Sequence, residues 1–417
     1  MKKEPVPWYF IILIILAGES IFFLPYVISR IFRPTVLEVF QINNLELGLC
    51  FSVYGLIALI SYIFGGPIAD KYTPRKLISV ALWLTALGGI FYSSFPKLEG
   101  LKILYGYWGI TTVLLFWSPM IKATRLWGAQ STQLKAFGFL EGGRGIVGAL
   151  IGSIGVIVFS IFMNNNLAES SFLENRVAFK YVILVSSLIV AFVGVLIWCF
   201  LKLEDNTRPD VMLDKISLDK ILFVLKLKSV WLLMIIILCA YIGYKITDVF
   251  SLYAKDVMLY NSVQSAQVAN SLLYSRPIIA ISLALFANNN NTSVLLMTGF
   301  AISFVGGLLF ALGIIQSYTT GVFIASLLVV AIGVYSLRAL YFAVMETGKI
   351  PLYLTGTAVG LISIIGYTPD IFSGPLIGYL LDNYPGSEGH QYVFLILSIF
   401  SIIGFIASWK YYTIYRG

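Results

Sequence analysis

The chain has 417 residues, of which 59% are hydrophobic and only 12% are charged, and its formal net charge is +8. Soluble domains carry about 25% charged residues, because their surface must be wetted by water. The composition therefore excludes an ordinary soluble protein and predicts an exterior that faces lipid.

The N-terminal segment has the charge and hydrophobicity of a secretory signal peptide. Its apolar stretch continues past Glu19 to Ile31, however, and no A-x-A cleavage pattern follows Ala17. A signal peptide is shorter and ends at such a pattern, so we expect a first transmembrane helix that is retained.

Twelve apolar stretches follow one another along the chain. Each has about the 20 residues with which a helix crosses a bilayer. They are too long and too continuous for the strands of a barrel, the other structure that satisfies its backbone in lipid. The sequence thus predicts an all-α integral membrane protein. The expected spans are 8–32, 46–69, 77–95, 101–123, 137–163, 177–201, 229–254, 264–287, 293–314, 319–344, 355–381 and 392–413.

The longest polar stretch falls after the sixth span and divides the spans into two sets of six. We expect an N-terminal six-helix bundle at 1–201, a cytoplasmic linker at 202–228 and a C-terminal six-helix bundle at 229–417. The mixed charges of the linker indicate a solvated segment with a short amphipathic helix.

Glycines in spans five and eleven suggest that the two halves are repeats. Aligning Gly138 with Gly360 also aligns Gly152 with Gly374. Glycine is common in membrane helices, where it lets backbones approach closely, but the match between these two spans favours a parallel repeat of six helices.

Lysine and arginine residues in the loops indicate the orientation. With the N-terminus inside, 17 of them fall on the cytoplasmic side and 6 on the outer side. Because cytoplasmic loops carry the excess of positive charge, we expect both termini in the cytoplasm. This distribution explains the net positive charge without a nucleic acid partner.

Several classes of site are absent from the sequence. The three cysteines, Cys50, Cys199 and Cys239, lie in apolar stretches and have neither disulfide nor metal spacing. The single histidine, His390, is expected in a solvated loop. No phosphate-binding loop, nucleophile–base set or metal cluster is present. We therefore expect no enzyme, no primary pump and no cofactor.

The segment GGPIADKYTPRKL at residues 65–77 interrupts the apolar pattern between spans two and three. Gly66 and Pro67 allow the end of span two to bend, and Asp70 lies at that end. The basic residues that follow are expected to anchor a loop on the inner leaflet; they are Lys71, Arg75 and Lys76.

This segment resembles the signature loop G-x-L-A-D-R-x-G-R-K of the major facilitator superfamily. The matching residues are Gly66, Ala69, Asp70, Arg75 and Lys76. Lys71 and Pro74 replace an arginine and a glycine of the signature, and the second copy of the loop, expected between spans eight and nine, reads ANNNNTS without charge.

The resemblance covers the whole chain and implies two pseudo-symmetric six-helix halves that transport by alternating access. In that family the aspartate of the loop pairs toward helix eleven and holds the outward-open state. The segments 138–149, 338–350 and 365–382 look like those of a bacterial branch of the superfamily. We accordingly expect a monomer in the bacterial inner membrane.

Charged residues within the predicted spans are candidate functional residues, because each costs several kcal/mol at bilayer depth. Apart from Lys180 and Lys410 near the span ends, spans three, six, nine and twelve contain none, and in the superfamily these four helices face lipid. The candidates for substrate binding, with aromatic residues of the same spans, are Arg276, Glu19, Lys245, Asp248, Asp370, Tyr26, Tyr54, Trp117, Tyr241, Tyr244 and Tyr367. The candidates for gating are Gly66, Asp70, Arg75, Lys76, Glu141, Arg144, Arg338 and Glu346.

Two pairs of opposite charges stand three residues apart on one helix. They are Glu141 with Arg144 and Lys245 with Asp248. Residues at this spacing share a helix face, so each pair is expected either to neutralise itself or to serve the transport cycle.

Arg276 has no acidic neighbour in its own stretch, NSLLYSRPIIAISLALF. Its planar fork suits a carboxylate or phosphate, so we expect anion binding; the alternative is a structural pair with Glu19, Asp248 or Asp370. The position resembles a substrate arginine on helix eight of oxalate and related organic-anion carriers. The lysine that those carriers have on helix eleven is replaced here by Asp370, which argues against a dicarboxylate held between two cations.

The sequence therefore predicts a secondary transporter for a small polar, anionic organic solute. It would work as an antiporter that exchanges a counter-anion or as a symporter coupled to protons through Glu19, Asp248 or Asp370. The alternatives are a membrane sensor built on a transporter fold and a proton-coupled carrier of a neutral or zwitterionic solute such as a sugar or an amino acid. Membrane lipid is the other expected partner.

Overall fold

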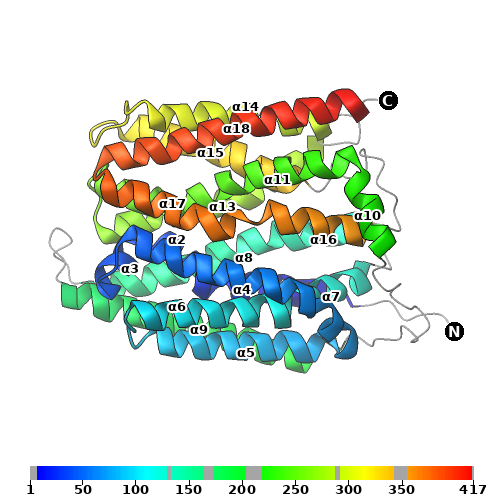
Figure 1. Cartoon of the computed structure of the whole chain (residues 1–417). Helices are drawn as coiled ribbons and strands as arrows, with labels where there is room; N and C mark the ends of the chain where they lie inside the picture. Colours follow the sequence, from blue (N-terminus) through cyan, green and yellow to red (C-terminus); the bar gives the residue numbers. More distant parts are fainter. Residues whose placement is uncertain are drawn as a thin grey trace. The chain divides into compact units, whose positions relative to one another are not determined.

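The computed structural model describes residues 7–128, 133–163, 172–202, 218–286, 292–341 and 355–415 of the chain. Every regular element within these ranges is a helix (Figure 1). A lipid solvent favours this outcome, since a helix satisfies all its backbone hydrogen bonds within one segment.

The helices form twelve successive rods, with breaks that fall inside some of them. The rods of the first half are α1 (Tyr9–Phe22) continued by η1 (Phe23–Val27) and α2 (Ile28–Ile31); α4 (Asn44–Lys71); α5 (Pro74–Tyr92); α6 (Leu98–Gly109) continued by η2 (Ile110–Trp117) and α7 (Ser118–Gly128); α8 (Gln133–Ile161); and α9 (Phe172–Phe200). Those of the second half are α11 (Lys228–Ile246) continued by η3 (Thr247–Val249) and α12 (Phe250–Asp256); α13 (Ser262–Phe286); α14 (Thr292–Ala311); α15 (Thr320–Leu340); α16 (Thr355–Gly366) continued by α17 (Pro369–Asn383); and α18 (Ser387–Tyr415). Two short helices, α3 (Arg33–Phe40) and α10 (Leu218–Lys226), lie between rods.

These rods confirm the all-helical, twelve-span architecture expected from the sequence. Within the described residues, 9 of the helices are long and apolar enough to cross a membrane by themselves. The remaining three rods are the interrupted helix α6–η2–α7, the helix α13 with Pro277 in its interior, and the broken pair α16–α17.

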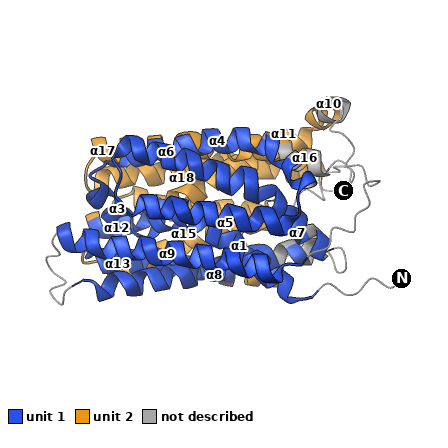
Figure 2. Ribbon diagram, turned by 90° about the horizontal axis from the view of Figure 1, so that it is seen from below, with its two compact units in different colours: residues 1–205, 248–255, 259–277 blue, residues 206–247, 256–258, 278–417 orange. Residues whose placement is uncertain are grey.

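The chain divides into two compact units, coloured separately in Figure 2. Unit 1 comprises residues 1–205, 248–255 and 259–277, and unit 2 comprises residues 206–247, 256–258 and 278–417. Unit 1 thus combines the first six rods with the later part of the seventh rod and most of the eighth. The domain boundaries at 201 and 229 follow the repeat in the sequence and remain a prediction.

Unit 1 is built around contacts of α1 with α8 and α9, of α4 with α6 and η2, and of α5 with α9. Figure 1 shows α4, α5, α6 and α9 running alongside one another. Large aromatic side chains fill the space between them, including the fully buried Trp108, Tyr92 and Phe179. At its start, α4 has a capping box, in which Asn43 and Glu46 satisfy each other's backbone N–H groups.

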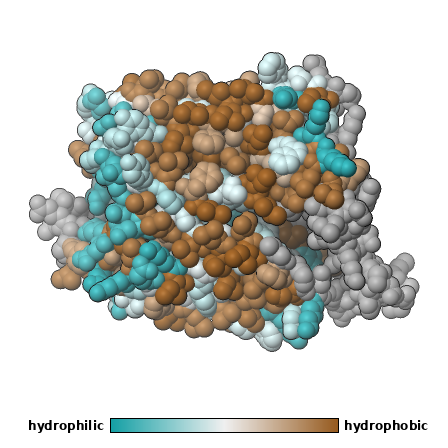
Figure 3. Space-filling view, viewed as in Figure 1, coloured by the Kyte–Doolittle hydropathy of each residue, from teal (hydrophilic) through white to brown (hydrophobic). Residues whose placement is uncertain are grey.

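In unit 2, α14 packs against α15 and α18, while α11 packs against α16 and α18. Its core is apolar and includes the fully buried Leu233, Phe300 and Ile362. In both units the outward faces of the helices are apolar as well, as the brown surface of Figure 3 shows for one side of the molecule. A soluble protein would place polar residues there, so the surface matches a lipid environment.

The first and fourth rods each contain a π-helical turn, η1 with Pro25 and η2. Proline lacks a backbone N–H and cannot make the usual bond to the preceding turn, which widens the helix locally. Such turns are frequent at functional positions of helices. Periodicity of the sequence does not reveal them, because one extra residue per turn leaves the apolar pattern nearly unchanged.

Three polar segments were expected between the spans: the loop at 65–77, the segment ANNNNTS and the linker. The structure corrects the first, and parts of all three lie outside the described residues. Helix α4 continues to Lys71 and α5 begins at Pro74, so the expected loop at 65–77 is mostly helix and leaves only two residues between the rods. The side chains of Gly66 and Asp70 lie outside the described residues, as do the asparagines of the ANNNNTS segment. The linker helix is present as α10, whereas residues 203–217 are not described.

The expectation of a solvated loop for His390 is wrong. His390 lies on the first turns of α18, is 0% exposed, and its Nε2 atom is 3.2 Å from Oδ2 of Asp256. The polar sequence SEGHQ suggested a loop, but the helix begins there and turns the histidine inward.

Labelling of single cysteines is expected to establish the orientation of the spans. In a Cys199→Ser background, Lys202→Cys at the end of α9 should react with an impermeant maleimide only from the cytoplasm. Ser387→Cys, in an exposed position before His390, should react only from outside. Cys50 and Cys239 are buried and serve as silent internal controls. Labelling of Ser387→Cys from the cytoplasm would overturn the predicted topology.

Candidate functional site

Four charged side chains form a closed ring of alternating sign within unit 1. Arg144 contacts Glu19 at 3.1 Å and Glu141 at 2.8 Å. Arg276 contacts the same two carboxylates, Glu141 at 3.3 Å and Glu19 at 3.6 Å. Each charge therefore has two neighbours of opposite sign, which is what a set of charges in a low-dielectric environment requires.

The ring depends on the close approach of α1 and α13 to α8. A Cβ atom at Gly148 would lie 2.9 Å from Oε1 of Glu19, and one at Gly145 would lie 2.9 Å from Cδ of Pro277. Larger residues at these positions would push the neighbouring helices away. The glycine-rich pattern of the fifth span thus positions the charges, as small residues at helix crossings do in membranes.

The members of the ring differ in exposure. The side chains of Glu19, Arg144 and Arg276 are only 4%, 5% and 6% exposed, whereas that of Glu141 is 47% exposed. The guanidinium of Arg144 also lies 5.5 Å from the ring centre of Phe22. Glu19, Arg144 and Arg276 are therefore fixed inside unit 1, whereas the carboxylate of Glu141 contacts both arginines from an accessible position.

The contacts of the ring show which of the predicted pairs are present. The pair of Glu141 with Arg144 is confirmed. Arg276 has Glu19 as a partner, as one alternative predicted, but its other partner is Glu141; Asp248 and Asp370 contact different cations. The sequence offered no means of pairing Arg276 with Glu141, because these residues lie on different rods.

A second buried ion pair in unit 1 joins the end of the first rod to the seventh. Arg30 on α2 donates from Nε to Oδ1 of Asp248 on η3, and their side chains are 3% and 7% exposed. The backbone carbonyl of Arg30 also accepts a hydrogen bond of 2.8 Å from the hydroxyl of Ser251. Arg30 was not among the residues expected at a site, although an arginine in the last turn of an apolar span is a signal that the sequence contains.

Lys245 and Asp248, which were expected to share a helix face, lie on either side of a change in helix type. The α-helix ends at Ile246, and the backbone passes into the 3-10 turn η3, which contains Asp248. The rule that residues three apart share a face assumes an uninterrupted α-helix. Within unit 2, Lys245 contacts Oδ1 of Asp370 at 3.2 Å, and the pairing of Lys245 with Asp248 stays a prediction.

Unit 2 contains a group of tyrosines around this second pair. The hydroxyl of Tyr241 is 3.0 Å from each carboxylate oxygen of Asp370. The ring of Tyr241 stacks on Tyr244 at 5.8 Å and meets Tyr367 edge to face at 4.8 Å. Both carboxylate oxygens of Asp370 are thus engaged by side chains of α11.

Arg338 belongs to the same group. Its guanidinium carbon lies 3.9 Å from the ring centre of Tyr244, a cation–π contact that fixes the plane of the guanidinium. Tyr341 extends the group through a hydroxyl contact of 3.2 Å with Tyr367. Five of the residues expected at a substrate site are thus neighbours in unit 2: Tyr241, Tyr244, Lys245, Tyr367 and Asp370.

The aromatic candidates of the first half lie in two places within unit 1. Tyr26, in the π-helical turn η1, packs edge to face on Tyr54 at 4.7 Å. The hydroxyl of Tyr54 bonds to Thr112, and its ring is buried. Trp117, at the end of η2, contacts Phe22 at 6.2 Å and thereby lies near Arg144. Tyr54 is mainly a packing residue, whereas Tyr26 and Trp117 are partly exposed.

The remaining gating candidates lie apart from the residues described so far or outside the described residues. Arg75 lies over the ring of Trp198 at 5.0 Å, and Lys76 is exposed. Glu346 lies outside the described residues. Among the residues that the structure describes, no group of three or more His, Cys, Asp or Glu side chains is arranged to hold a metal ion.

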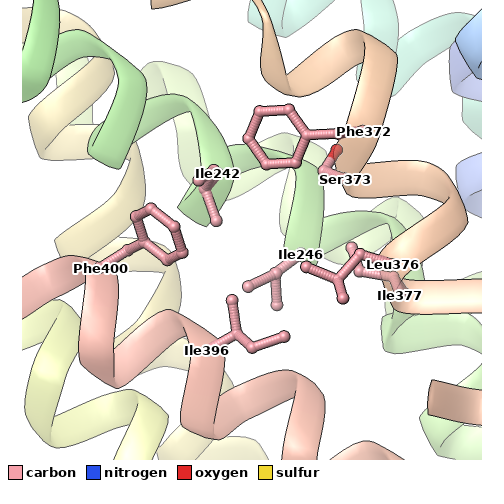
Figure 4. A pocket seen from close by; sticks show the side chains of 8 residues that line it. All are labelled: Ile242, Ile246, Phe372, Ser373, Leu376, Ile377, Ile396 and Phe400. Atoms are coloured by element: carbon pink, nitrogen blue, oxygen red, sulfur yellow. The ribbon is translucent and has the colours of Figure 1, made fainter. Parts of the chain in front are cut away.

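A hollow in unit 2 differs from these charged groups in its chemistry. Figure 4 shows side chains of α11, α17 and α18 around it, among them Ile246, Phe372 and Phe400. The one polar residue of its lining, Ser373, donates its hydroxyl proton to the carbonyl of Pro369 at 2.6 Å. With Phe372 and Leu376 exposed at its rim, the hollow suits hydrocarbon and offers nothing to a polar solute.

Breaking the pair of Lys245 and Asp370 is expected to destabilise the protein. Asp370→Asn removes the carboxylate that lies 3.2 Å from Lys245, whose side chain is 4% exposed, and removing one partner of a buried pair costs about 3–5 kcal/mol. The double variant Lys245→Met/Asp370→Asn should recover most of this loss, because both charges are gone. Thermal unfolding in detergent measures both, with the exposed Glu388→Gln as a control. Equal stability of Asp370→Asn and the wild type would contradict the pairing.

Comparison with known proteins places these observations in a family. Residues 8–373 match the family model of the Major Facilitator Superfamily. The chain is 28% identical to inner membrane protein YqcE of Escherichia coli strain K12 over 397 residues, which are 93% of this chain and 91% of the relative. It is 27% identical to inner membrane protein YihN of the same organism over 408 residues, 96% of this chain and 94% of that one.

Solved structures of transporters are similar to the chain over nearly its full length. A mutant of the nucleoside transporter NupG gives a TM-score of 0.70 at 14% identity, with 96% of this chain and 100% of that chain covered. A bacterial homolog of the human lysosomal transporter Spinster, in an inward-facing and unoccupied conformation, gives 0.68 at 15% identity and covers 97% of both chains. At these identities the likeness shows the fold alone.

Proposed function

Because the chain belongs to the major facilitator superfamily and is therefore a multi-pass membrane transporter, we propose that it carries a small polar organic anion by alternating access. The observation that supports this proposal is the ring of Glu19, Glu141, Arg144 and Arg276, in which two buried arginines face one accessible carboxylate. Its relatives named as inner membrane proteins support a location in a bacterial inner membrane.

In this proposal, Glu141 occupies the place that the anionic group of the substrate takes. Arginine stays charged at any physiological pH, so Arg144 and Arg276 always need a negative partner. Exchanging the carboxylate of Glu141 for that of a solute keeps the number of ion pairs constant. The exchange therefore avoids the large cost of leaving a buried charge without a partner.

The ring also supports a role in the transport cycle. It connects the first and fifth rods, which belong to the first half of the sequence, to Arg276 on the eighth rod. The pair of Arg30 and Asp248 connects the first rod to the seventh in the same way. If the two halves of the sequence move against each other, as alternating access requires, these contacts break and form again in each cycle.

A second candidate function is the proton-coupled transport of a neutral or zwitterionic solute. The tyrosines around Asp370 favour it, because ring faces and hydroxyls suit sugars, and one structural neighbour is named a nucleoside transporter. In this case Asp370, whose side chain is 16% exposed, would be the group that takes up the proton.

Uptake by purified protein in proteoliposomes tests the proposal. A panel of carboxylates, phosphate esters, sulfonates, sugars and amino acids should show saturable uptake of one anionic class, with competition only from other anions. Running each solute with and without a pH gradient separates antiport from proton symport. Uptake of a neutral solute that no anion of the panel inhibits would overturn the proposal in favour of the second candidate.

The variant Glu141→Gln tests the competition between Glu141 and the substrate. Without its charge, residue 141 competes less well for the arginines, so the KM for the anion should fall several-fold while kcat falls because release is slower. Glu99→Gln, which changes a surface carboxylate that is 79% exposed, should alter neither constant. A higher KM in Glu141→Gln would contradict the proposed exchange.

A further inference from the structure

Unit 1 has a hollow at the level where two membrane spans end, away from the charged ring. Its lining consists of Ser93, Ser94, Phe95, Arg176, Val177 and Lys180. The first three residues directly follow α5, and the others lie in the first turns of α9. Its volume of about 290 Å³ is near the lower end of the range for small-ligand sites, which is ~300 Å³.

The hollow carries concentrated positive charge. Arg176 and Lys180 are four residues apart, so they lie on the same face of α9. Within the part of the chain that the structure describes, neither of them has an ion-pair partner. The nearby Asn175 is bonded to Glu38 at 3.0 Å, and Glu38 also faces Lys255 at 3.8 Å, so that acid is engaged elsewhere.

The remaining lining residues prepare the hollow for a ligand. Phe95 has a left-handed backbone, with φ of 56°, and its ring lies 4.9 Å from the guanidinium of Arg176. This contact restricts the arginine before any ligand arrives. The hydroxyls of Ser93 and Ser94 donate their protons to the carbonyls of Ile90 and Phe91, both at 2.7 Å. Their oxygens are therefore left as acceptors for a donor group.

The neighbouring surface indicates that the ligand comes from the membrane. Ile90 and Phe91 on α5 are exposed, and so are Leu173, Val177 and Tyr181 on α9. Large apolar side chains in this position face lipid chains, and exposed aromatic residues mark the headgroup level. An anion that binds in the hollow would thus have hydrocarbon directly beside it.

We infer that this hollow binds the headgroup of an anionic phospholipid, with the phosphodiester between Arg176 and Lys180 and the acyl chains along the exposed apolar faces of α5 and α9. Basic sites between transmembrane helices recognise lipid headgroups in this way. Phosphatidylglycerol fits best, because its headgroup has a negative charge and hydroxyl donors for the oxygens of Ser93 and Ser94. The site is independent of the transported solute, since neither α5 nor α9 contributes to the ring.

The full-length protein in lipid nanodiscs tests the inference, with phosphatidylcholine alone or mixed with phosphatidylglycerol. Phosphatidylglycerol should raise the Tm of the wild type, because a ligand that binds only the folded state stabilises it. The double variant Arg176→Gln/Lys180→Gln should keep its Tm in phosphatidylcholine but lose most of that increase. Lys97→Gln, a nearby exposed lysine outside the hollow, should retain the increase.

Native mass spectrometry and a soluble anion provide the decisive comparison. The double variant should bind phosphatidylglycerol roughly tenfold or more weakly at one site, as expected for the loss of charge-assisted bonds. Glycerol phosphate without acyl chains should leave the Tm of the wild type unchanged. An equal increase in Tm for the double variant would overturn the inference, and stabilisation by glycerol phosphate alone would replace the lipid site with a site for a free anion.

Discussion

Arg144→Ala is expected to destabilise the protein by about 3–5 kcal/mol and to abolish transport, because it leaves the buried carboxylate of Glu19 with a single, more distant cation. Arg144 makes the two shortest contacts of the ring, at 3.1 and 2.8 Å, whereas the contacts of Arg276 are 3.3 and 3.6 Å. Arg276→Ala should therefore remain folded with a smaller loss of stability, yet be equally inactive. Thermal unfolding and proteoliposome uptake measure the two effects separately.

Double variants show whether Arg276 binds substrate or only supports the fold. If it is structural, Arg276→Ala combined with Glu141→Gln removes one charge of each sign and should restore both stability and transport. If it binds the anion, stability should return without transport, and Arg276→Lys should keep the fold while the KM rises, because lysine lacks the bidentate fork. Recovery of transport in the double variant would contradict the binding of the anion by Arg276.

The architecture was predictable because one dominant force determines it. In lipid, twelve apolar stretches of sufficient length form twelve helices, because a helix satisfies its backbone hydrogen bonds within one segment. The predicted ends of the spans lie within a few residues of the ends of the rods. The helix α3 and the π-helical turns were not predicted from the sequence. They depend on local backbone geometry, such as that at Pro25, and hardly change the hydrophobic pattern.

The identities of the charged residues in the membrane were also predictable, since each is costly enough to stand out. Their partners were not. Glu141 and Arg144 could be paired because they share an uninterrupted helix. The same rule does not decide the pairing of Lys245 and Asp248, because the helix changes to a 3-10 turn at Thr247. Contacts between rods, such as Arg276 with Glu141, depend on helix packing that a single sequence does not encode in its spacing.

Asp248→Asn is expected to open the contact between the first and seventh rods. Arg30 and Asp248 are both buried, and removing one partner of such a pair costs about 3–5 kcal/mol, which corresponds to a factor of about 100 or more in an equilibrium between two conformations. Because Asp248 is joined to Arg30 in this structure, the variant should favour conformations in which these rods separate. Transport should slow, since one state of the cycle is then poorly populated.

Labelling of buried cysteines measures the opening. Ser265→Cys on α13 and Ser303→Cys on α14 both replace fully buried serines. The first lies in unit 1, which also contains Arg30 and Asp248, and the second lies in unit 2. In a Cys199→Ser background, Asp248→Asn should accelerate maleimide labelling at 265 at least tenfold and leave 303 unreactive. Faster labelling at both positions would mean general unfolding, and an unchanged rate at 265 would mean that the pair does not hold the rods together.

The double variant Arg30→Gln/Asp248→Asn shows whether the pair controls the conformation or only stabilises the fold. The double variant removes both charges of this pair, so most of the lost thermal stability should return. The ion pair that joins the rods is still missing, however, and labelling at 265 should stay fast. If the pair controls the conformation, the double variant recovers its thermal stability while position 265 is still labelled fast. Recovery of both the stability and the slow labelling would assign Arg30 and Asp248 a purely structural role.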